Sequence, residues 1–206
     1  MNKKVFIIIL IAIIVISCII FIGVRSIKSK QGIEEEENNM YSSGKHHATI
    51  EVKEYGTIKL ELDADTAPLT VANFAKLVNE GFYDGITFHR IIDGFMIQGG
   101  DPLGNGTGGS SEKIKGEFKL NGVNNNISHV RGVISMARAN AYNSASSQFF
   151  IVHEDSTFLD GQYAGFGKVT SGIEIVDQIC QDIKVEDNNG TVLSNNQPII
   201  EKIKIK

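Results

Sequence analysis

Tryptophan is absent from this chain of 206 residues, and proline and cysteine are scarce, with 3 and 2 copies. The two cysteines, Cys18 and Cys180, lie near opposite ends of the chain, so the sequence offers neither a disulfide framework nor a zinc-ligand spacing. No basic stripe is present and the formal net charge is -4, which makes nucleic acid a poor candidate partner. The content of 42% apolar and 21% charged residues is instead the balance of a globular protein.

An apolar run without a charged residue lies near the start of the chain, at residues 5–24. Roughly 20 residues at about 1.5 Å of rise each just cross a hydrocarbon core of about 30 Å. We therefore expect a transmembrane anchor at residues 5–24 and a short cytoplasmic N-terminus at residues 1–4. The remaining chain would then lie outside the cell membrane, although basic residues on both flanks of the run orient it only weakly.

A second interpretation of this run is a lipoprotein signal. The residues Val15-Ile16-Ser17-Cys18 resemble the cleavage box of bacterial lipoproteins, in which case Cys18 would carry the lipid anchor. The apolar run continues beyond Cys18, which favours the transmembrane interpretation, and both stay open. Residues 25–44 are polar and contain the acidic run at residues 34–37. Such a composition cannot bury a core, so it predicts a linker before a domain at residues 45–206.

The domain shows mainly the period of β-strands. Apolar and polar residues alternate on both sides of a turn at Gly56, which predicts a hairpin, and they alternate again at residues 198–205. Between these ends, glycine-rich or polar turns separate five short stretches typical of strands. These stretches are residues 87–92, 95–98, 132–137, 148–152 and 165–169.

Two helices are predicted within the same domain. For the first, Thr66 or Thr70 can act as the N-cap, Pro68 suits the first turn and Gly81 suits the end. The second is expected at about residues 172–183, where the apolar side chains recur with a helical period. A closed eight-stranded antiparallel β-barrel capped by two α-helices fits this order. An open α+β sheet fits the periodicity nearly as well, so the pattern alone leaves both open.

A dense series of short motifs in a fixed order resembles the cyclophilins over about residues 46–206. The motifs are Phe88-His89-Arg90, Gly94-Phe95-Met96, Gln98-Gly99-Gly100-Asp101, Gly106-Thr107-Gly108-Gly109, Ile134-Ser135-Met136-Ala137, Ser147-Gln148-Phe149-Phe150-Ile151, Leu159-Asp160-Gly161 and Phe166-Gly167-Lys168-Val169. The resemblance implies the mainly β barrel named above. It also implies a peptidyl-prolyl cis-trans isomerase, which needs no cofactor.

Isomerisation breaks no bond, but it must overcome a rotation barrier of about 20 kcal/mol at the peptide bond before proline. The enzyme therefore has to bind the twisted amide better than either planar form. By its place in the motif, the resemblance assigns to Arg90 the charged donor that stabilises the twisted amide, and to Gln98 the glutamine that positions it. On a regular strand, Arg90 would face away from His89 and Ile91.

The resemblance also implies the substrate-binding residues. Phe95, Met96, Phe150 and Leu159 match the apolar pocket for the proline ring, although ordinary core packing would also explain such residues. Strict alternation would place Phe95 and Met96 on opposite faces, so we expect an irregular backbone near Gly94.

Further residues match the rest of the substrate groove. Gln148 matches a second polar group, and Ala137 and Arg138 match the segment whose main chain pairs with an extended substrate peptide.

The sequence departs from the family pattern at three of these positions. Arg138 lies where asparagine is frequent, and its charge suggests a preference for acidic peptides. Phe158 lies where many eukaryotic relatives carry tryptophan, so the indole N–H that favours tight cyclosporin binding is missing. Tyr163 replaces a histidine and can still wall the pocket and donate a hydrogen bond.

Other functions fit less well. No spacing among His89, His129 and His153 matches a metal-ligand signature, so we expect structural or surface roles for them and no metal. The partners expected are proline-containing polypeptides, bound by a monomer at the membrane, and the folding of exported proteins is the natural role. The rival interpretation is a non-catalytic proline-peptide binding or chaperone module. The presence of Arg90 and Gln98 together with the pocket residues favours the enzyme.

Overall fold

The computed structural model describes residues 40–206 of the chain. The expected membrane anchor, Cys18 and most of the polar linker lie outside this range. Within residues 40–206, none of the helices is both long enough and apolar enough to span a bilayer. The last residues assigned to the linker already contact the domain: Tyr41 is 8% exposed, its ring packs on that of His46 with centroids 4.9 Å apart, and the N–H of Gly44 donates to Asp65.

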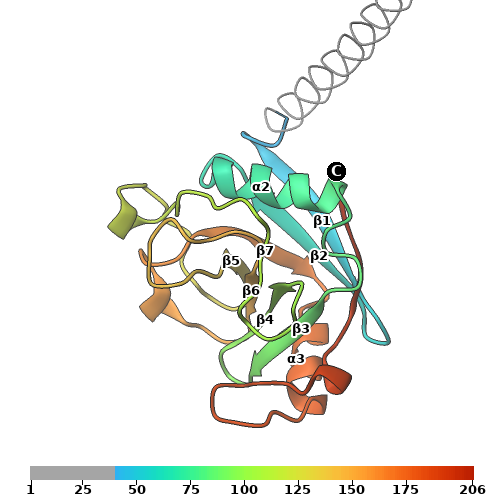
Figure 1. Cartoon of the computed structure of the whole chain (residues 1–206). Helices are drawn as coiled ribbons and strands as arrows, with labels where there is room; N and C mark the ends of the chain where they lie inside the picture. The colour runs from blue at the N-terminus through green and yellow to red at the C-terminus, as the bar shows by residue number, and fades with distance from the viewer. Residues whose placement is uncertain (1–39) are drawn as a thin grey trace, which may run out of the picture. The chain divides into compact units, whose positions relative to one another are not determined.

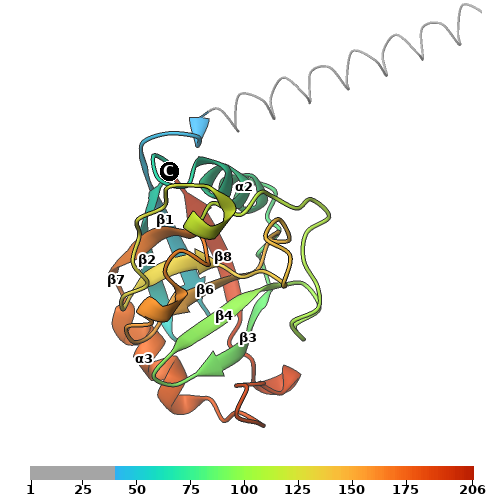
Figure 2. The same ribbon diagram turned by 90° about the vertical axis from the view of Figure 1, so that its left-hand side faces the viewer.

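Eight antiparallel strands form one curved sheet, flanked by two helices (Figure 1). The strands are β1 (Lys45–Val52), β2 (Gly56–Asp63), β3 (Thr87–Ile92), β4 (Met96–Asp101), β5 (Val133–Met136), β6 (Phe149–Val152), β7 (Gly165–Ser171) and β8 (Ile200–Ile205). Their order across the sheet is β3-β4-β6-β5-β7-β2-β1-β8. The helices α2 (Pro68–Asn79) and α3 (Ile173–Asp182) lie at opposite ends of the strands, as Figure 2 also shows.

The sheet is a half-barrel rather than the fully closed barrel expected from the sequence. Its terminal strands β3 and β8 meet through one isolated bridge, between Thr87 and Ile199, with neighbouring main-chain hydrogen bonds. The free edge of β3 is occupied instead by residues 190–192: the N–H of Ile91 donates to Gly190, and the N–H of Val192 donates to His89. This segment forms hydrogen bonds with backbone groups of β3 that would pair with β8 in a closed barrel.

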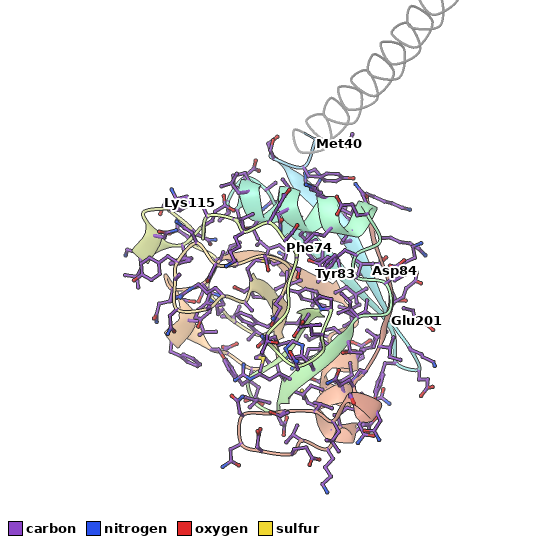
Figure 3. The ribbon with its side chains drawn as sticks, in the orientation of Figure 1. Met40, Phe74, Tyr83, Asp84, Lys115 and Glu201 are labelled. Atoms are coloured by element: carbon purple, nitrogen blue, oxygen red, sulfur yellow. The ribbon has the colours of Figure 1, made fainter. Side chains whose placement is uncertain are left out.

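Aromatic side chains fill the main core inside the curved sheet. Phe74 of α2 lies against Tyr83, with ring centroids 5.3 Å apart, and Figure 3 shows both side chains pointing into the interior. Phe149 of β6 packs edge-on against Phe74 and Tyr83. The alternation of β1 and β2 is confirmed, because Ile50 and Ile58 are fully buried in the same core. The pattern that predicted the hairpin therefore marks its inner face.

The N-terminus of α2 is stabilised by a distant residue, and the predicted threonine N-caps are wrong. The cap position is Ala67, without a side-chain hydrogen bond, although Pro68 lies in the first turn as expected. Glu117, which is 2% exposed, accepts hydrogen bonds from the main-chain N–H of Leu69 and Thr70 at 3.1 and 2.8 Å. Its carboxylate thus satisfies two donors that a local cap would otherwise serve, and its negative charge suits the helix dipole.

We expect Glu117→Ala to lower the free energy of unfolding by about 2–3 kcal/mol, because the part-buried N–H of Leu69 and the buried N–H of Thr70 both lose their acceptor. Urea denaturation of the two proteins measures the difference. The matched control is Glu112→Ala, which removes a carboxylate that pairs with Lys76 at the surface and should change the free energy by less than about 1 kcal/mol. Equal effects of the two substitutions would show that Glu117 does not stabilise α2 in this way.

Candidate active site

A groove of about 600 Å³ opens along one side of the sheet, and its floor and walls come from separate parts of the chain. Ten of the side chains predicted for the site line it: Arg90, Phe95, Met96, Gln98, Ala137, Arg138, Phe150, Phe158, Leu159 and Tyr163. Gln148 lines an adjoining hollow, which shares Gln98, Ala137 and Arg138 with the groove. The fold therefore brings together all the residues that the resemblance selects.

The apolar floor of the groove is a small hydrophobic cluster distinct from the main core. It contains the buried side chains of Met96, Phe150 and Leu159, with Phe95 and Tyr163 packed against them. The ring of Tyr163 meets that of Phe150 edge-on, and the ring of Phe95 lies 5.6 Å from that of Phe158. These residues therefore form a buried apolar cluster that also lines an open groove.

The turn between β3 and β4 places Phe95 and Met96 beside the same groove. Gly94 has a φ of +74°, a left-handed backbone conformation that residues with a side chain rarely adopt. The N–H of Phe95 donates to the carbonyl of Ile92 across the turn. The irregular backbone expected near Gly94 is therefore confirmed. Strand β4 begins only at Met96, so Phe95 stands on the turn and is not bound by the alternation of the strand.

Arg90 reaches the groove from β3, but the predicted opposition of Arg90 and His89 is wrong. Both side chains line the groove. The pairing of β3 with β4 is shifted between Phe88 and Arg90, which face Gly99 and Gln98, so His89 is the extra residue of a β-bulge. A bulge turns two successive side chains towards the same side of the sheet. The sequence around the glycines of β4 does not show that β3 would contain this extra residue.

A chain of hydrogen bonds fixes the guanidinium of Arg90. Its Nη1 donates to Gln98 Oε1 at 3.1 Å, and its Nε donates to the carbonyl of Asn189 at 2.8 Å. Gln98 donates in turn to Gln148 Oε1 at 2.9 Å, and Gln148 donates to the carbonyl of Gly108 at 2.7 Å. Within residues 40–206 no group accepts a hydrogen bond from Nη2 of Arg90, so this donor is available to a ligand.

Burial lowers the pKa of the Arg90 guanidinium, while Tyr163 and Asp187 oppose this shift. The ordinary pKa of arginine is so high that the group stays charged at neutral pH. The groove therefore offers a permanent, half-buried positive charge beside an apolar floor, and the partial exclusion of water strengthens its interactions.

Asp101 holds the glycine-rich loop that covers one side of the groove. Its carboxylate accepts hydrogen bonds from the main-chain N–H of Leu103, Asn105 and Gly106. Burial alone would raise the pKa of Asp101, but these backbone donors together outweigh burial and hold its pKa below the usual range. A side chain at Gly108 would collide with the same carboxylate, which explains the glycine at that position.

Arg138 is held more firmly than its place in the sequence suggested. Its Nε donates to the carbonyl of Gln162 at 3.0 Å, and its guanidinium lies over the rings of Phe118, Tyr142 and Tyr163 at 4.7–5.3 Å. Its main-chain N–H and C=O make no hydrogen bond to another residue in the described part of the chain. These two groups at the edge of the groove are therefore free to pair with an extended peptide.

Sequence reasoning missed the part of the groove contributed by residues 189–191. Asn189 and Thr191 line the groove, and the carbonyl of Asn189 anchors Arg90. Asp187 shapes this loop by accepting hydrogen bonds from the N–H of Asn189 and Thr191. An aspartate followed by asparagine and glycine is typical of a turn, but nothing in that signal shows which strand the turn will contact.

Two histidines near the groove are buried, in agreement with the structural roles expected of them. His129 is 0% exposed; its Nδ1 bonds to Asp160 and its Nε2 to Ser135. Its ring stacks behind that of Phe150, with centroids 6.1 Å apart. His89 is 4% exposed, and no residue in the range 40–206 forms a hydrogen bond with its ring nitrogens. Burial lowers the pKa of both imidazoles, against the opposing charges of Asp160 and Asp101.

We expect the free energy of unfolding to fall in two stages on acidification. Above the ordinary histidine pKa of 6.5, His89 and His129 are neutral in both states and contribute nothing to the pH dependence. Below it, these histidines bind protons in the unfolded chain but stay neutral in the folded chain, so the free energy of unfolding falls. Asp101 and Asp160 have a lowered pKa, so the stability they add is present above 3.8 and is lost as the pH falls through their folded pKa.

Urea denaturation between about pH 8 and about pH 3 measures this profile. A free energy of unfolding that stays constant from about pH 7 to about pH 5 would contradict the assignment of two buried neutral histidines.

Many known proteins are similar to this chain in sequence and in structure. Residues 47–206 match the family model described as cyclophilin type peptidyl-prolyl cis-trans isomerase/CLD. The chain is 48% identical over 134 residues to peptidyl-prolyl cis-trans isomerase B of Bacillus subtilis, covering 63% of this chain and 90% of that protein. It is 45% identical over 142 residues to a peptidyl-prolyl cis-trans isomerase of Helicobacter pylori, covering 68% of this chain and 83% of the relative.

Solved structures agree with the sequence relatives. A crystal structure of a Cryptosporidium parvum cyclophilin type peptidyl-prolyl cis-trans isomerase superposes with a TM-score of 0.69 and 32% identity. It covers 79% of this chain and 98% of its own. A second crystal structure of that protein, in the presence of the dipeptide Ala-Pro, has a TM-score of 0.68 and 33% identity, and covers 78% and 98%.

Proposed function

The chain belongs to the cyclophilin-type peptidyl-prolyl cis-trans isomerases, and we propose that Arg90 is the group that stabilises the twisted Xaa–Pro bond in the reaction of this family. One observation carries the proposal: the guanidinium of Arg90 stands at the edge of the apolar floor, and Gln98 fixes its Nη1 at 3.1 Å. Isomerisation of a short Xaa–Pro peptide by the wild-type chain and by Arg90→Ala tests it.

The chemistry follows from what twisting does to an amide. Rotation about the C–N bond removes conjugation and leaves the proline nitrogen pyramidal and more basic. A fixed cationic N–H donor stabilises this state more than the planar ground states, which is what lowers the barrier. Met96, Phe150 and Leu159 would hold the proline ring while the preceding residue rotates, and no proton transfer is required.

The main chain at the edge of the groove suggests how the rest of the substrate binds. The free main-chain groups of Arg138 lie beside the apolar floor and suit an extended segment on one side of the proline. The aromatic rings around the guanidinium of Arg138 hold its charge near that segment, which supports the expected preference for acidic residues. Phe158 and Tyr163 wall the pocket without an indole N–H, so we expect weak cyclosporin binding.

We further propose that this enzyme acts as a monomer outside the cell membrane and accelerates the folding of exported proteins. The support is the sequence: the uncharged apolar run at residues 5–24 and the polar residues 25–39 precede a domain with its own core. A lipid anchor on Cys18 is the alternative means of attachment.

Protease treatment of intact cells tests this placement. We expect residues 40–206 to be digested, or released as a folded fragment, from intact cells, because the polar segment before them would be exposed. Protection that disappears only on lysis would place the domain in the cytoplasm. Replacement of Cys18 by serine should leave the protein in the membrane fraction if the apolar run is the anchor, and should release or mislocalise it if Cys18 carries the lipid.

A further inference from the structure

A second group of polar side chains lies at the turn between β3 and β4, and none of its members lines the groove. Asp93 stands on the turn, His153 directly follows β6, and Cys180 lies on α3. One oxygen, one nitrogen and the sulfur of these three side chains lie within 4.8 Å of one another. No sequence motif joins residues so far apart in the chain, which is why spacing alone predicted no metal ligands.

His153 is fixed in the tautomer that a metal-binding histidine needs. Its Nδ1 accepts a hydrogen bond from the N–H of Gly94 at 3.0 Å, and since an amide N–H can only donate, Nδ1 carries no proton. Its Nε2 therefore carries the proton and donates to Asp177 at 3.0 Å. Metal-binding histidines commonly donate their other N–H to a carboxylate in this way, which fixes the ring and raises the basicity of the ligating nitrogen.

Neighbouring groups fix this arrangement. Arg131 donates to Asp177 at 2.8 Å and so holds the carboxylate that orients His153. Asp93 Oδ1 lies 3.4 Å from the unprotonated Nδ1 of His153, and its side chain is 76% exposed. It can therefore rotate towards an ion without disturbing the core.

Cys180 is a buried thiol beside two carboxylates. Burial raises its pKa to about 12, and Asp93 and Asp177 add to this effect. In the absence of a cation the sulfur therefore stays protonated. A divalent ion would reverse this by replacing the thiol proton, which would leave to solvent. A hollow of about 220 Å³, lined by Asp93 and Cys180 among others, gives an ion a path from the surface.

We propose that Asp93, His153 and Cys180 bind a divalent transition-metal ion of the zinc class. The ligands are a carboxylate oxygen of Asp93, Nδ1 of His153 and Sγ of Cys180, with the fourth position of a tetrahedron open to water. Nitrogen, sulfur and oxygen together suit Zn²⁺, with bonds of about 2.0–2.3 Å, whereas Mg²⁺ and Ca²⁺ prefer oxygen alone. The ion joins the β3–β4 turn to β6 and α3, and it replaces the hydrogen bond between Gly94 and His153.

The test uses the full chain carrying Cys18→Ser, so that Cys180 is its single thiol. Co²⁺ serves as the spectroscopic probe and Zn²⁺ as its competitor. We expect one Co²⁺ to bind with a sulfur-to-cobalt charge-transfer band, Zn²⁺ to abolish the band, and Zn²⁺ to raise Tm. Cys180→Ser should remove the band, and the exposed Asp93→Asn should weaken Co²⁺ binding at least tenfold without changing Tm in the absence of metal.

The matched control is Asp84→Asn, which removes an exposed aspartate paired with Lys202 elsewhere on the domain. It should leave the affinity for Co²⁺ unchanged. Binding of Co²⁺ without the sulfur band would place the ion elsewhere, for example at His46 and His47, and would overturn the proposal. A band that survives Cys180→Ser, or an affinity that Asp93→Asn leaves unaltered, would do the same.

Discussion

Replacing Arg90 by alanine is expected to lower kcat/KM for a Xaa–Pro peptide at least tenfold, which corresponds to about 1.4 kcal/mol or more of transition-state binding. The loss has two sources. The cationic donor disappears from the edge of the apolar floor. Gln98 also loses the hydrogen bond of 3.1 Å that its Oε1 accepts from Arg90. The effect should fall mainly on kcat, because Phe150 and Leu159 remain in the apolar floor where we propose that the proline ring binds.

The conservative variant Arg90→Lys separates charge from geometry. A lysine keeps the charge, but its three N–H donors sit on a single nitrogen atom. They cannot reproduce the separate positions of Nε, which donates to the carbonyl of Asn189, Nη1, which donates to Gln98, and the remaining Nη2. We expect it to recover only part of the lost activity. An unchanged Tm for both variants is the control for folding. Full activity in Arg90→Ala would leave the enzyme in place but would refute the role assigned to this arginine.

The substitution Gly100→Ala is expected to lower the free energy of unfolding by more than about 4 kcal/mol, or to prevent folding altogether. Gly100 has a φ of +84°, and a Cβ there would collide with the carbonyl of Ser147 and lie 3.0 Å from Cα of Gln148. Both atoms belong to backbone that cannot rotate away. The collision would displace the segment that leads into β6, which carries Phe150 to the groove.

Gly122→Ala is the matched control for this prediction. Gly122 has a φ of +77°, close to that of Gly100, but a Cβ there would meet nothing within 4 Å. It should therefore show the cost of the left-handed backbone alone, about 1–2 kcal/mol. Urea denaturation compares the two variants. A cost for Gly100→Ala as small as that for Gly122→Ala would mean that β4 and β6 yield more easily than their packing indicates.

The strands could be predicted from the sequence because their patterning is local. Alternation located β1 and β2, and the bounds predicted for β3, residues 87–92, are those of the structure. Helix α3 follows from the recurrence of Val176 and Ile179, both fully buried. The site residues came from the order of the motifs rather than from periodicity, since neither Phe95 nor Phe150 differs in pattern from a core residue.

What could not be predicted depends on contacts between distant segments. Glu117 serves the N-terminus of α2 across 47–48 positions of the chain, and no local signal marks it as a cap. The bulge at His89 depends on how β3 meets β4, and the half-barrel depends on residues 190–192 occupying the edge of β3. In each case, a contact with a distant segment determines which of the locally possible structures forms.

Exchange between the cis and trans forms of a short Xaa–Pro peptide, followed by NMR with a small amount of residues 40–206, tests the central claim most directly. These residues contain a complete core of their own, including Tyr41. We predict rapid exchange with the wild-type domain and much slower exchange with Arg90→Ala, although both bind the peptide. Binding of the peptide by a folded wild-type domain without any exchange would contradict the account and would favour a non-catalytic peptide-binding module.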